Sequence, residues 1–180
     1  MKNSLKSFFS FCWEVVEVVV LALLIVVPIR YFLFQPFVVD GSSMEPSFYD
    51  GDYLIVDQIS YRFRQPERGE VIIFYAPTDP SRRFIKRVVG LPGEQLEAID
   101  QQIMITTPEG EKFFFEDYYS QSTVYRSFSV TLEEDQYFVL GDNRDRSYDS
   151  RFWGYLPADN VIGRAVLRLW PVNRISKIIP

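Results

Sequence analysis

Apolar residues are distributed in two different ways along this chain. From Phe8 to Phe34 they form an almost continuous run, and no charged residue occurs between Val18 and Ile29. About 20 helical residues are needed to cross the hydrocarbon core of a bilayer. The run therefore predicts a transmembrane anchor within residues 1–35, which must include Glu14 and Glu17 to be long enough.

The residues around this run indicate its orientation. Lys2 and Lys6 precede it and Arg30 follows it, a modest excess of positive charge that favours a cytoplasmic N-terminus. A cleaved signal peptide is the alternative, with the two lysines as its basic region, but no small-x-small cleavage site follows. We therefore expect a retained single-pass anchor in the plasma membrane, with residues 36–180 on the outer, extracytoplasmic face.

Residues 36–180 show the pattern of a β-rich domain. Short runs of β-branched and aromatic residues alternate with turn residues, and no long helical period follows the anchor. Such runs are typical of short antiparallel strands. The clearest are 53–57, 70–75, 102–106, 112–115, 136–140 and 165–170. The predicted fold is mainly β, one transmembrane helix followed by an extracytoplasmic domain, in which residues 95–135 form the least constrained, insert-like region.

Composition narrows the chemistry available to this domain. The 180 residues contain no histidine and a single cysteine, Cys12, which lies in the apolar run. Serine-histidine-aspartate and cysteine-histidine sites, zinc sites of histidine and cysteine, and intrachain disulfides are therefore excluded. A hydrolase would have to use serine with lysine, paired carboxylates or a carboxylate-held metal. The net charge of −5 argues against a nucleic-acid partner, because such proteins usually present a basic face.

The first candidate segment follows the apolar run directly. Residues 39–47 place Gly41 and Ser42 before a hydroxyl at Ser43 and reach a proline at Pro46. Glycine permits unusual backbone angles and proline fixes its own φ, so such a bend can present a side-chain oxygen to a substrate. An ordinary polar turn has the same composition. A nucleophilic Ser43 therefore requires a base elsewhere in the chain.

Residues 82–94 contain the candidate base. On a strand, Lys86 shares one face with Phe84 and Val88 while Arg87 points to the other, and alternation alone does not decide which cation points inward. Arginine keeps its proton in proteins and cannot act as a base. Lysine can, once burial among apolar groups lowers its pKa by as much as about 3–5. The alternative is a solvated basic strand edge that deters aggregation.

A third segment, residues 141–154, has a dense alternation of charges. Its acidic residues are possible calcium ligands, but the EF-hand spacing is absent and Arg144 and Arg146 would repel the ion. Paired carboxylates also occur in glycosidases, yet nothing in the sequence indicates a sugar cleft. A salt-bridged loop that supports a site explains the pattern better.

In this order after one apolar run, the three segments resemble type I signal peptidases. The resemblance rests on residues 41–47, 86–94 and 141–151, supported by 50–56, 68–74 and 153–157. It extends from about Phe37 to Pro171 and is interrupted at 95–135. It implies a membrane-anchored serine endopeptidase with a serine-lysine dyad on a β-rich fold, which removes signal peptides from exported preproteins after a small-x-small motif. The implied partners are preprotein signal peptides and the lipid bilayer, with no nucleic acid, metal or cofactor.

The resemblance also implies a role for each matching residue. Ser43 matches the nucleophile and Lys86 the general base, while Ser147 matches a hydroxyl that orients the lysine. The charges that match supporting residues are Arg87, Asp142, Asp149 and Arg151. The residues that match pockets for small side chains are Val39, Met44, Phe84 and Ile85.

The match departs from the family at a few positions. One branch of the family has a serine two residues before the nucleophile that assists the oxyanion hole, and Gly41 stands there instead. Arg146 and Tyr148 fall at variable loop positions. Two other functions fit the same residues: a related serine-lysine protease with one dedicated substrate, and a membrane-tethered β binding module in which Ser43 and Lys86 are structural.

Overall fold

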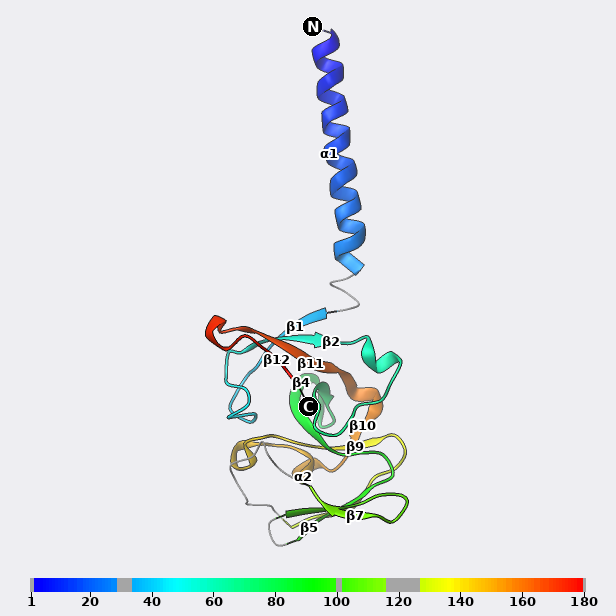
Figure 1. The fold of residues 1–180 in the computed structure, drawn as a ribbon, viewed down its shortest axis with the longest axis vertical. Coiled ribbons are helices and arrows are strands. Elements are labelled where there is room, and N and C mark those ends of the chain that lie inside the picture. Colours follow the sequence, from blue (N-terminus) through cyan, green and yellow to red (C-terminus); the bar gives the residue numbers. More distant parts are fainter. Residues whose placement is uncertain (1, 29–33, 100–101, 116–126, 180) are drawn as a thin grey trace.

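The structure is a computed structural model that describes residues 2–28, 34–99, 102–115 and 127–179. It consists of one long N-terminal helix and a β-rich body, and the helix extends away from that body (Figure 1). Every strand pairing found in the described residues is antiparallel. This confirms the mainly β fold that the short apolar runs predicted.

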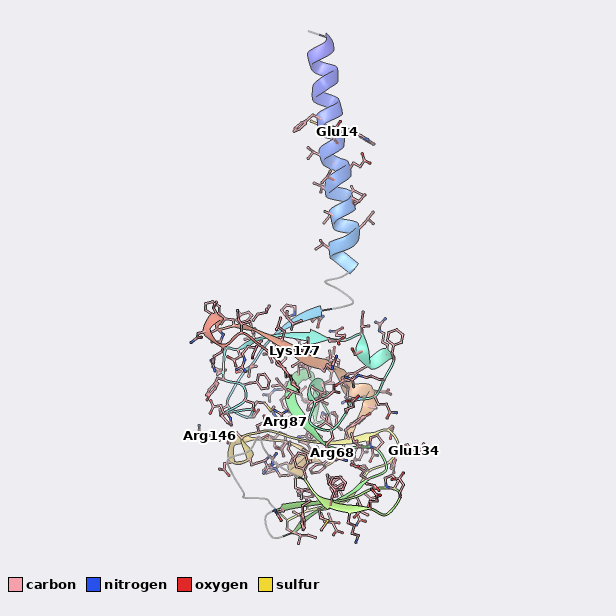
Figure 2. The ribbon with its side chains drawn as sticks, in the orientation of Figure 1. Glu14, Arg68, Arg87, Glu134, Arg146 and Lys177 are labelled. Carbon is pink, nitrogen blue, oxygen red and sulfur yellow. The ribbon has the colours of Figure 1, made fainter. Side chains whose placement is uncertain are left out.

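Helix α1 spans Lys2–Pro28 and covers most of the predicted anchor. Its described apolar side chains are exposed, with Trp13 and Leu24 among the most accessible, and they project outward without a packing partner in the body (Figure 2). Among the residues that the structure describes, no helix combines the length and the apolar character needed to cross a membrane. The predicted transmembrane span is therefore not found there; Glu14 and Glu17 lie within the helix, and carboxylates are costly in hydrocarbon.

The larger sheet has eight strands and forms the part of the body nearest to α1 (Figure 1). Its order is β1-β2-β11-β3-β4-β9-β10, with β12 paired to β11. The strands are β1 (Phe34–Val38), β2 (Tyr53–Asp57), β3 (Val71–Ala76), β4 (Asp79–Gly90), β9 (Gln136–Leu140), β10 (Leu156–Pro157), β11 (Val161–Trp170) and β12 (Ser176–Lys177). Short helices lie in its connections: η2 (Ser60–Arg62), η3 (Arg144–Arg146), α2 (Ser150–Trp153), η4 (Ala158–Asn160) and η5 (Val172–Arg174).

A second sheet of four strands is built from the region predicted to be least constrained. Its order is β7-β6-β5-β8. The strands are β5 (Gln95–Ile99), β6 (Gln102–Thr106), β7 (Lys112–Phe114) and β8 (Ser129–Thr131). Leu96, Ile103 and Ile105 alternate inward and pack in one apolar cluster with Phe138 and Leu140 of β9, so this sheet shares a core with the larger one. Residues 100–101 and 116–126 of the predicted insert-like region lie outside the described residues.

The position of β3 in the fold explains why its sequence is continuously apolar rather than alternating. Val71 and Ile73 belong to one buried cluster and Ile72 and Phe74 to another. A strand covered on both faces buries successive side chains, and such strands read as unbroken apolar runs. The first of these clusters also contains Val39 and Met44, which lie on either side of the candidate nucleophile in the sequence.

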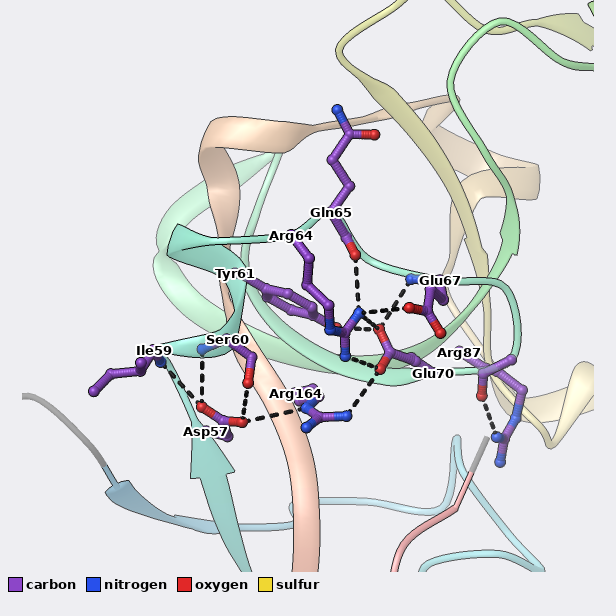
Figure 3. A network of polar contacts seen from close by, with 11 residues as sticks. Asp57, Ile59, Ser60, Tyr61, Arg64, Gln65, Glu67, Glu70, Arg87 and Arg164 are labelled. Atoms are coloured by element: carbon purple, nitrogen blue, oxygen red, sulfur yellow. Dashed lines mark hydrogen bonds and ion pairs between the residues drawn. The ribbon is translucent and has the colours of Figure 1, made fainter.

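A buried ionic network joins β2, β3 and β11 (Figure 3). The Glu70 carboxylate, which immediately precedes β3, accepts hydrogen bonds from Tyr61 and Arg64 and from Arg164 of β11. Arg164 also bonds Asp57 at the end of β2. Burial by itself would raise the pKa of Glu70, but the hydrogen bonds from its partners outweigh burial and lower it. These contacts hold together the strands that lie between β1 and β4, the two strands that border the site.

Candidate active site

Ser43 and Lys86, which are 43 residues apart in the chain, meet at the candidate site. The Lys86 Nζ donates a hydrogen bond to the Ser43 Oγ at 2.7 Å. Ser43 lies in the turn that follows β1, and Lys86 lies in the buried half of β4. The sheet order separates β1 from β4 by three strands, so the contact depends on the curvature of the larger sheet. The structure thus brings together the two residues that the sequence proposed as nucleophile and base.

Backbone hydrogen bonds shape the turn that carries Ser43. Gly41 has a φ of 86°, in the left-handed region that favours glycine, and its N–H donates to the Asp50 carboxylate at 2.8 Å. The Val39 N–H donates to the Asp52 carbonyl at 2.9 Å. Met44 is fully buried beneath the turn. Two features therefore fix the position of the Ser43 hydroxyl. The next residue, Met44, is buried, and the preceding residues Val39 and Gly41 are hydrogen-bonded to the loop at residues 50–52.

The surroundings of Lys86 favour its uncharged form. The side chain is buried, its Nζ also donates to the Ile85 carbonyl at 2.8 Å, and the amine lies 5.5 Å from the centre of the Phe84 ring. Burial lowers the pKa of Lys86 from 10.5 to about 8, although the carboxylates of Asp149 and Asp142 act in the opposite direction. At pH 7 about one molecule in ten therefore carries an uncharged amine.

Arg87 points away from Lys86, to the opposite face of β4. Its guanidinium makes a two-pronged pair with the Asp142 carboxylate, at 2.9 and 2.7 Å, and donates to the Gly69 carbonyl at 2.7 Å. Both partners of the pair are buried. The structure therefore decides what strand alternation left open: Lys86 faces the nucleophile, and Arg87 fastens β4 to the loop after β9.

Asp149 and Arg151 close the charged loop. Asp149 accepts from the Arg151 guanidinium at 2.8 and 2.9 Å and from the Gly141 N–H at 3.1 Å, and it caps helix α2. Arg151 donates to the carbonyls of Arg144 and Ser147. Asp142 and Asp149, two of the carboxylates considered as calcium ligands, are thus bound to guanidinium groups, as expected for a salt-bridged loop.

Ser147 lies beside the dyad without bonding Lys86. It is buried, and its Oγ has no hydrogen-bond partner among the described residues. A Cβ added to Gly141 would overlap both the Ser147 Oγ and the Ser43 carbonyl oxygen. The Asn143 N–H donates to that same Ser43 carbonyl at 3.1 Å. The loop therefore packs directly against the nucleophile through a position where only glycine fits.

A groove of about 590 Å³ opens at the dyad. Of the four residues predicted to bind substrate, Phe84 and Ile85 line it, whereas Val39 and Met44 lie in the apolar cluster beneath. The remaining lining residues, besides the dyad, are Phe37, Asp40, Gly41, Ser42, Arg82, Arg83, Arg146 and Tyr148. The sequence interpretation missed most of these. Their positions depend on the approach of three separate segments, which no local pattern signals.

Comparison with known proteins places these features in a family. A family model described as signal peptidase, peptidase S26, matches residues 12–170. A probable signal peptidase I-2 of Synechocystis sp. is 39% identical over 169 residues, covering 91% of this chain and 75% of the relative. A signal peptidase I of Leptolyngbya laminosa is 38% identical over 175 residues, covering 93% and 84%.

A solved structure was also found. The signal peptidase I of Enterococcus faecalis V583 has 33% sequence identity and a TM-score of 0.47, and the match covers 56% of this chain and 97% of that one. The extent of the family match and the identity to these two relatives decide the assignment: the chain belongs to the signal peptidase family, peptidase S26.

Proposed function

We propose that this protein is a membrane-attached serine endopeptidase that removes signal peptides from preproteins, with Ser43 as nucleophile and Lys86 as general base. The observation that carries the proposal is the 2.7 Å hydrogen bond between a buried amine and a hydroxyl that lines the groove. An amine whose pKa is about 8 is uncharged often enough near neutral pH to take a proton from serine.

The reaction begins with attack by the Ser43 oxygen on the carbonyl carbon of the scissile peptide bond. Uncharged Lys86 accepts the hydroxyl proton as the new carbon–oxygen bond forms, and becomes an ammonium. It then gives this proton to the leaving amine as the peptide bond breaks, which leaves an acyl ester on Ser43. A water molecule, deprotonated in turn by Lys86, hydrolyses the ester and regenerates the hydroxyl.

Backbone groups supply the oxyanion hole in this proposal. The Ser43 N–H donates to no group of the described residues, so it is available to the oxyanion that develops next to its own side chain. Gly41 offers no side-chain donor. The Asn143 bond to the Ser43 carbonyl and the close packing of Gly141 hold this peptide unit in place. Arg87, Asp142, Asp149 and Arg151 support the site by fixing that loop.

The groove accounts for the proposed preference for small-x-small sequences. An extended substrate that adds beside a strand edge presents alternate side chains to the wall. Phe84 and Ile85 form that wall next to Lys86, and Val39 and Met44 fill the space behind it. A wall backed by a packed core leaves only shallow room, which suits the small residues that end signal peptides.

Helix α1 attaches the enzyme to the bilayer in this proposal. Its exposed apolar side chains lie apart from the body, and contact with lipid would remove this surface from water. Lys2 and Lys6 favour a cytoplasmic N-terminus. The proposed location is therefore the plasma membrane, with the body on the outer face.

Incubation of the purified protein with a preprotein, read by mass spectrometry, tests the function. Cleavage after small-x-small is the expected result. Ser43→Ala and Lys86→Ala should each abolish it while circular dichroism shows a folded domain. Retained turnover in folded Lys86→Ala would contradict the dyad. Cleavage of one natural substrate but of no generic signal peptide would instead identify a dedicated protease, and unchanged function in both variants a binding module.

A further inference from the structure

The groove beside the dyad has a charge opposite to that of the whole chain. The chain has a net charge of −5, yet Arg82, Arg83 and Arg146 all line the groove against one carboxylate, that of Asp40. The three arginines are solvent-exposed. Such a local reversal of charge attracts negatively charged partners to the groove and repels positive ones.

These guanidinium groups form no ion pair with a carboxylate of the described residues, although the Arg82 charge, after the hydrogen bonds from Ser81, helps to lower the pKa of Asp79. Within the described part of the chain, neither Arg82 nor Arg83 forms an ion pair, and the Arg146 side chain forms no hydrogen bond or ion pair. Asp79, the acidic residue nearest to Arg82 along β4, accepts hydrogen bonds from Ser81. Arg146 projects from the edge of the body (Figure 2). The N–H groups of three guanidinium groups are therefore available to bind a ligand.

Two of the arginines are held in place by aromatic rings on opposite walls. The Arg82 guanidinium lies 5.3 Å from the centre of the Phe84 ring on its own strand, and that of Arg83 lies 5.9 Å from the Phe37 ring of β1. A stacked guanidinium keeps its N–H edges free, and these edges match a carboxylate in two-pronged geometry. Stacking thus prepares both groups for an acidic side chain that enters the groove.

The strand register places Arg82 relative to the reaction. Phe84 and Lys86 occupy alternate positions of β4 and share one face. Arg82 lies in the irregular register between Arg83 and Asp79, but its guanidinium lies over the Phe84 ring and so on the same side. Arg82 and Lys86 are four residues apart, which is about 13 Å along a strand. An extended substrate that pairs with β4 has the same rise per residue. The substrate residue next to Arg82 is therefore about four positions away from the substrate residue next to Lys86. Because Phe84 lines the wall proposed for the residues before the scissile bond, that position lies on the signal-peptide side.

We infer that Arg82, assisted by Arg83 and Arg146, makes this enzyme prefer preproteins with an acidic residue about five positions before the cleavage site. The inference rests on the proposed function. It adds a specificity determinant outside the small-x-small pockets, and its chemical class is a carboxylate in an extended peptide. A charge-assisted, partly exposed pair should favour Asp over Asn at that position by about threefold to tenfold in kcat/KM.

The test measures kcat/KM for paired peptides that differ only by Asp or Asn at each position from six before to four after the cleavage site. The expected result is a peak in the Asp/Asn ratio near five before it, which falls as salt rises from about 0.05 to 0.5 M. Arg82→Gln should bring the Asp/Asn ratio close to one, and Arg82→Glu should bring it below one because the new carboxylate repels Asp. Arg62→Gln, an equal charge change at an exposed residue of η2 outside the groove, should preserve the ratio.

Several outcomes would overturn the inference. A ratio near one at every position, or an equal loss in Arg62→Gln, would rule out a specific carboxylate contact. A peak after the cleavage site would refute the position assigned to Arg82. If Arg82→Gln slowed Asp and Asn peptides equally, and only on vesicles that contain anionic lipid, the arginines would bind headgroups instead. Failure to cleave any peptide would reject the proposed function itself, which keeps the two results distinct.

Discussion

Phe84 controls how much water reaches the Lys86 amine, so Phe84→Ala should move the acid limb of the pH–rate profile. The ring lies 5.5 Å from the amine, and both residues line the groove. Ile72, the register partner of Lys86 on β3, is fully buried and stays in place in the variant. Removing the ring therefore opens one side of the amine to solvent.

The magnitude follows from the pKa of Lys86. Its displacement from 10.5 to about 8, caused first by burial, corresponds to about 3 kcal/mol of lost hydration. If one open side restores about a third of this, the pKa rises to about 9. The uncharged fraction at pH 7 then falls from about one tenth to about one hundredth. We expect kcat/KM at pH 7 to fall about tenfold for this reason alone.

The assay is kcat/KM on a fluorogenic signal-peptide substrate between pH 6 and 10. Phe84 also lines the groove, so its loss can weaken substrate binding, but that effect is the same at every pH. The shift of the midpoint isolates the effect on the amine. Phe63→Ala, which removes a highly exposed ring elsewhere, should keep the original midpoint near 8. An unmoved midpoint in Phe84→Ala would refute the link between ring, hydration and base.

Three further perturbations test the supports of the site. Because the folded-state pKa of Lys86 lies below its unfolded value, burying the ammonium costs stability below about pH 8, and this cost disappears above about pH 10.5. Lys86→Met should therefore be more stable than the parent chain by about 1–3 kcal/mol at pH 7 and by much less at pH 10.5, as measured by urea denaturation. Asp142→Ala removes the carboxylate that pairs with the buried Arg87 guanidinium and should destabilise the domain by about 3–5 kcal/mol, whereas Arg87→Met with Asp142→Leu should recover most of this loss in the same assay. Gly141→Ala should lower kcat at least about tenfold, because the added methyl group would overlap Ser147 and displace the loop from the nucleophile. Unchanged turnover would show that the loop accommodates the methyl group without moving Ser43.

The strands were largely readable from the sequence. Residues 53–57 and 136–140, which are rich in β-branched and aromatic side chains, form β2 and β9 with the predicted bounds. The prediction succeeded there because these runs end at turn residues such as Gly51 and Gly141, where pairing stops. The sheet at 95–135 was harder, because its strands are short and their apolar faces make sense only against Phe138 and Leu140 of β9.

The chemistry of the site was readable from residue types, but its geometry was not. The absence of histidine leaves lysine as the base for Ser43, and arginine cannot lose its proton. Alternation could not tell whether Lys86 or Arg87 faced the nucleophile, because a strand's two faces become distinct only once other parts of the chain pack on either side of the sheet. The buried positions of Val39 and Met44 likewise depend on the cluster they share with Ile85.

Charged and polar loop residues were the least predictable. Arg146 and Tyr148 looked incidental in sequence, yet they line the groove because η3 turns the loop back toward Ser43. Ser147 lies next to the dyad, but its hydroxyl does not bond Lys86. Hydrogen-bond partners of this kind depend on ångström-scale loop geometry, which residue spacing does not encode.

The most direct test is the titration of the Lys86 amine itself. The sequence contains five lysines, so NMR of protein labelled with ¹³C at the lysine ε-carbons gives few signals, and Lys86→Met assigns the one from Lys86. We predict a midpoint near pH 8 for that signal. A midpoint above pH 10 for Lys86 would mean that the amine stays charged at neutral pH, and it would contradict a lysine base for Ser43.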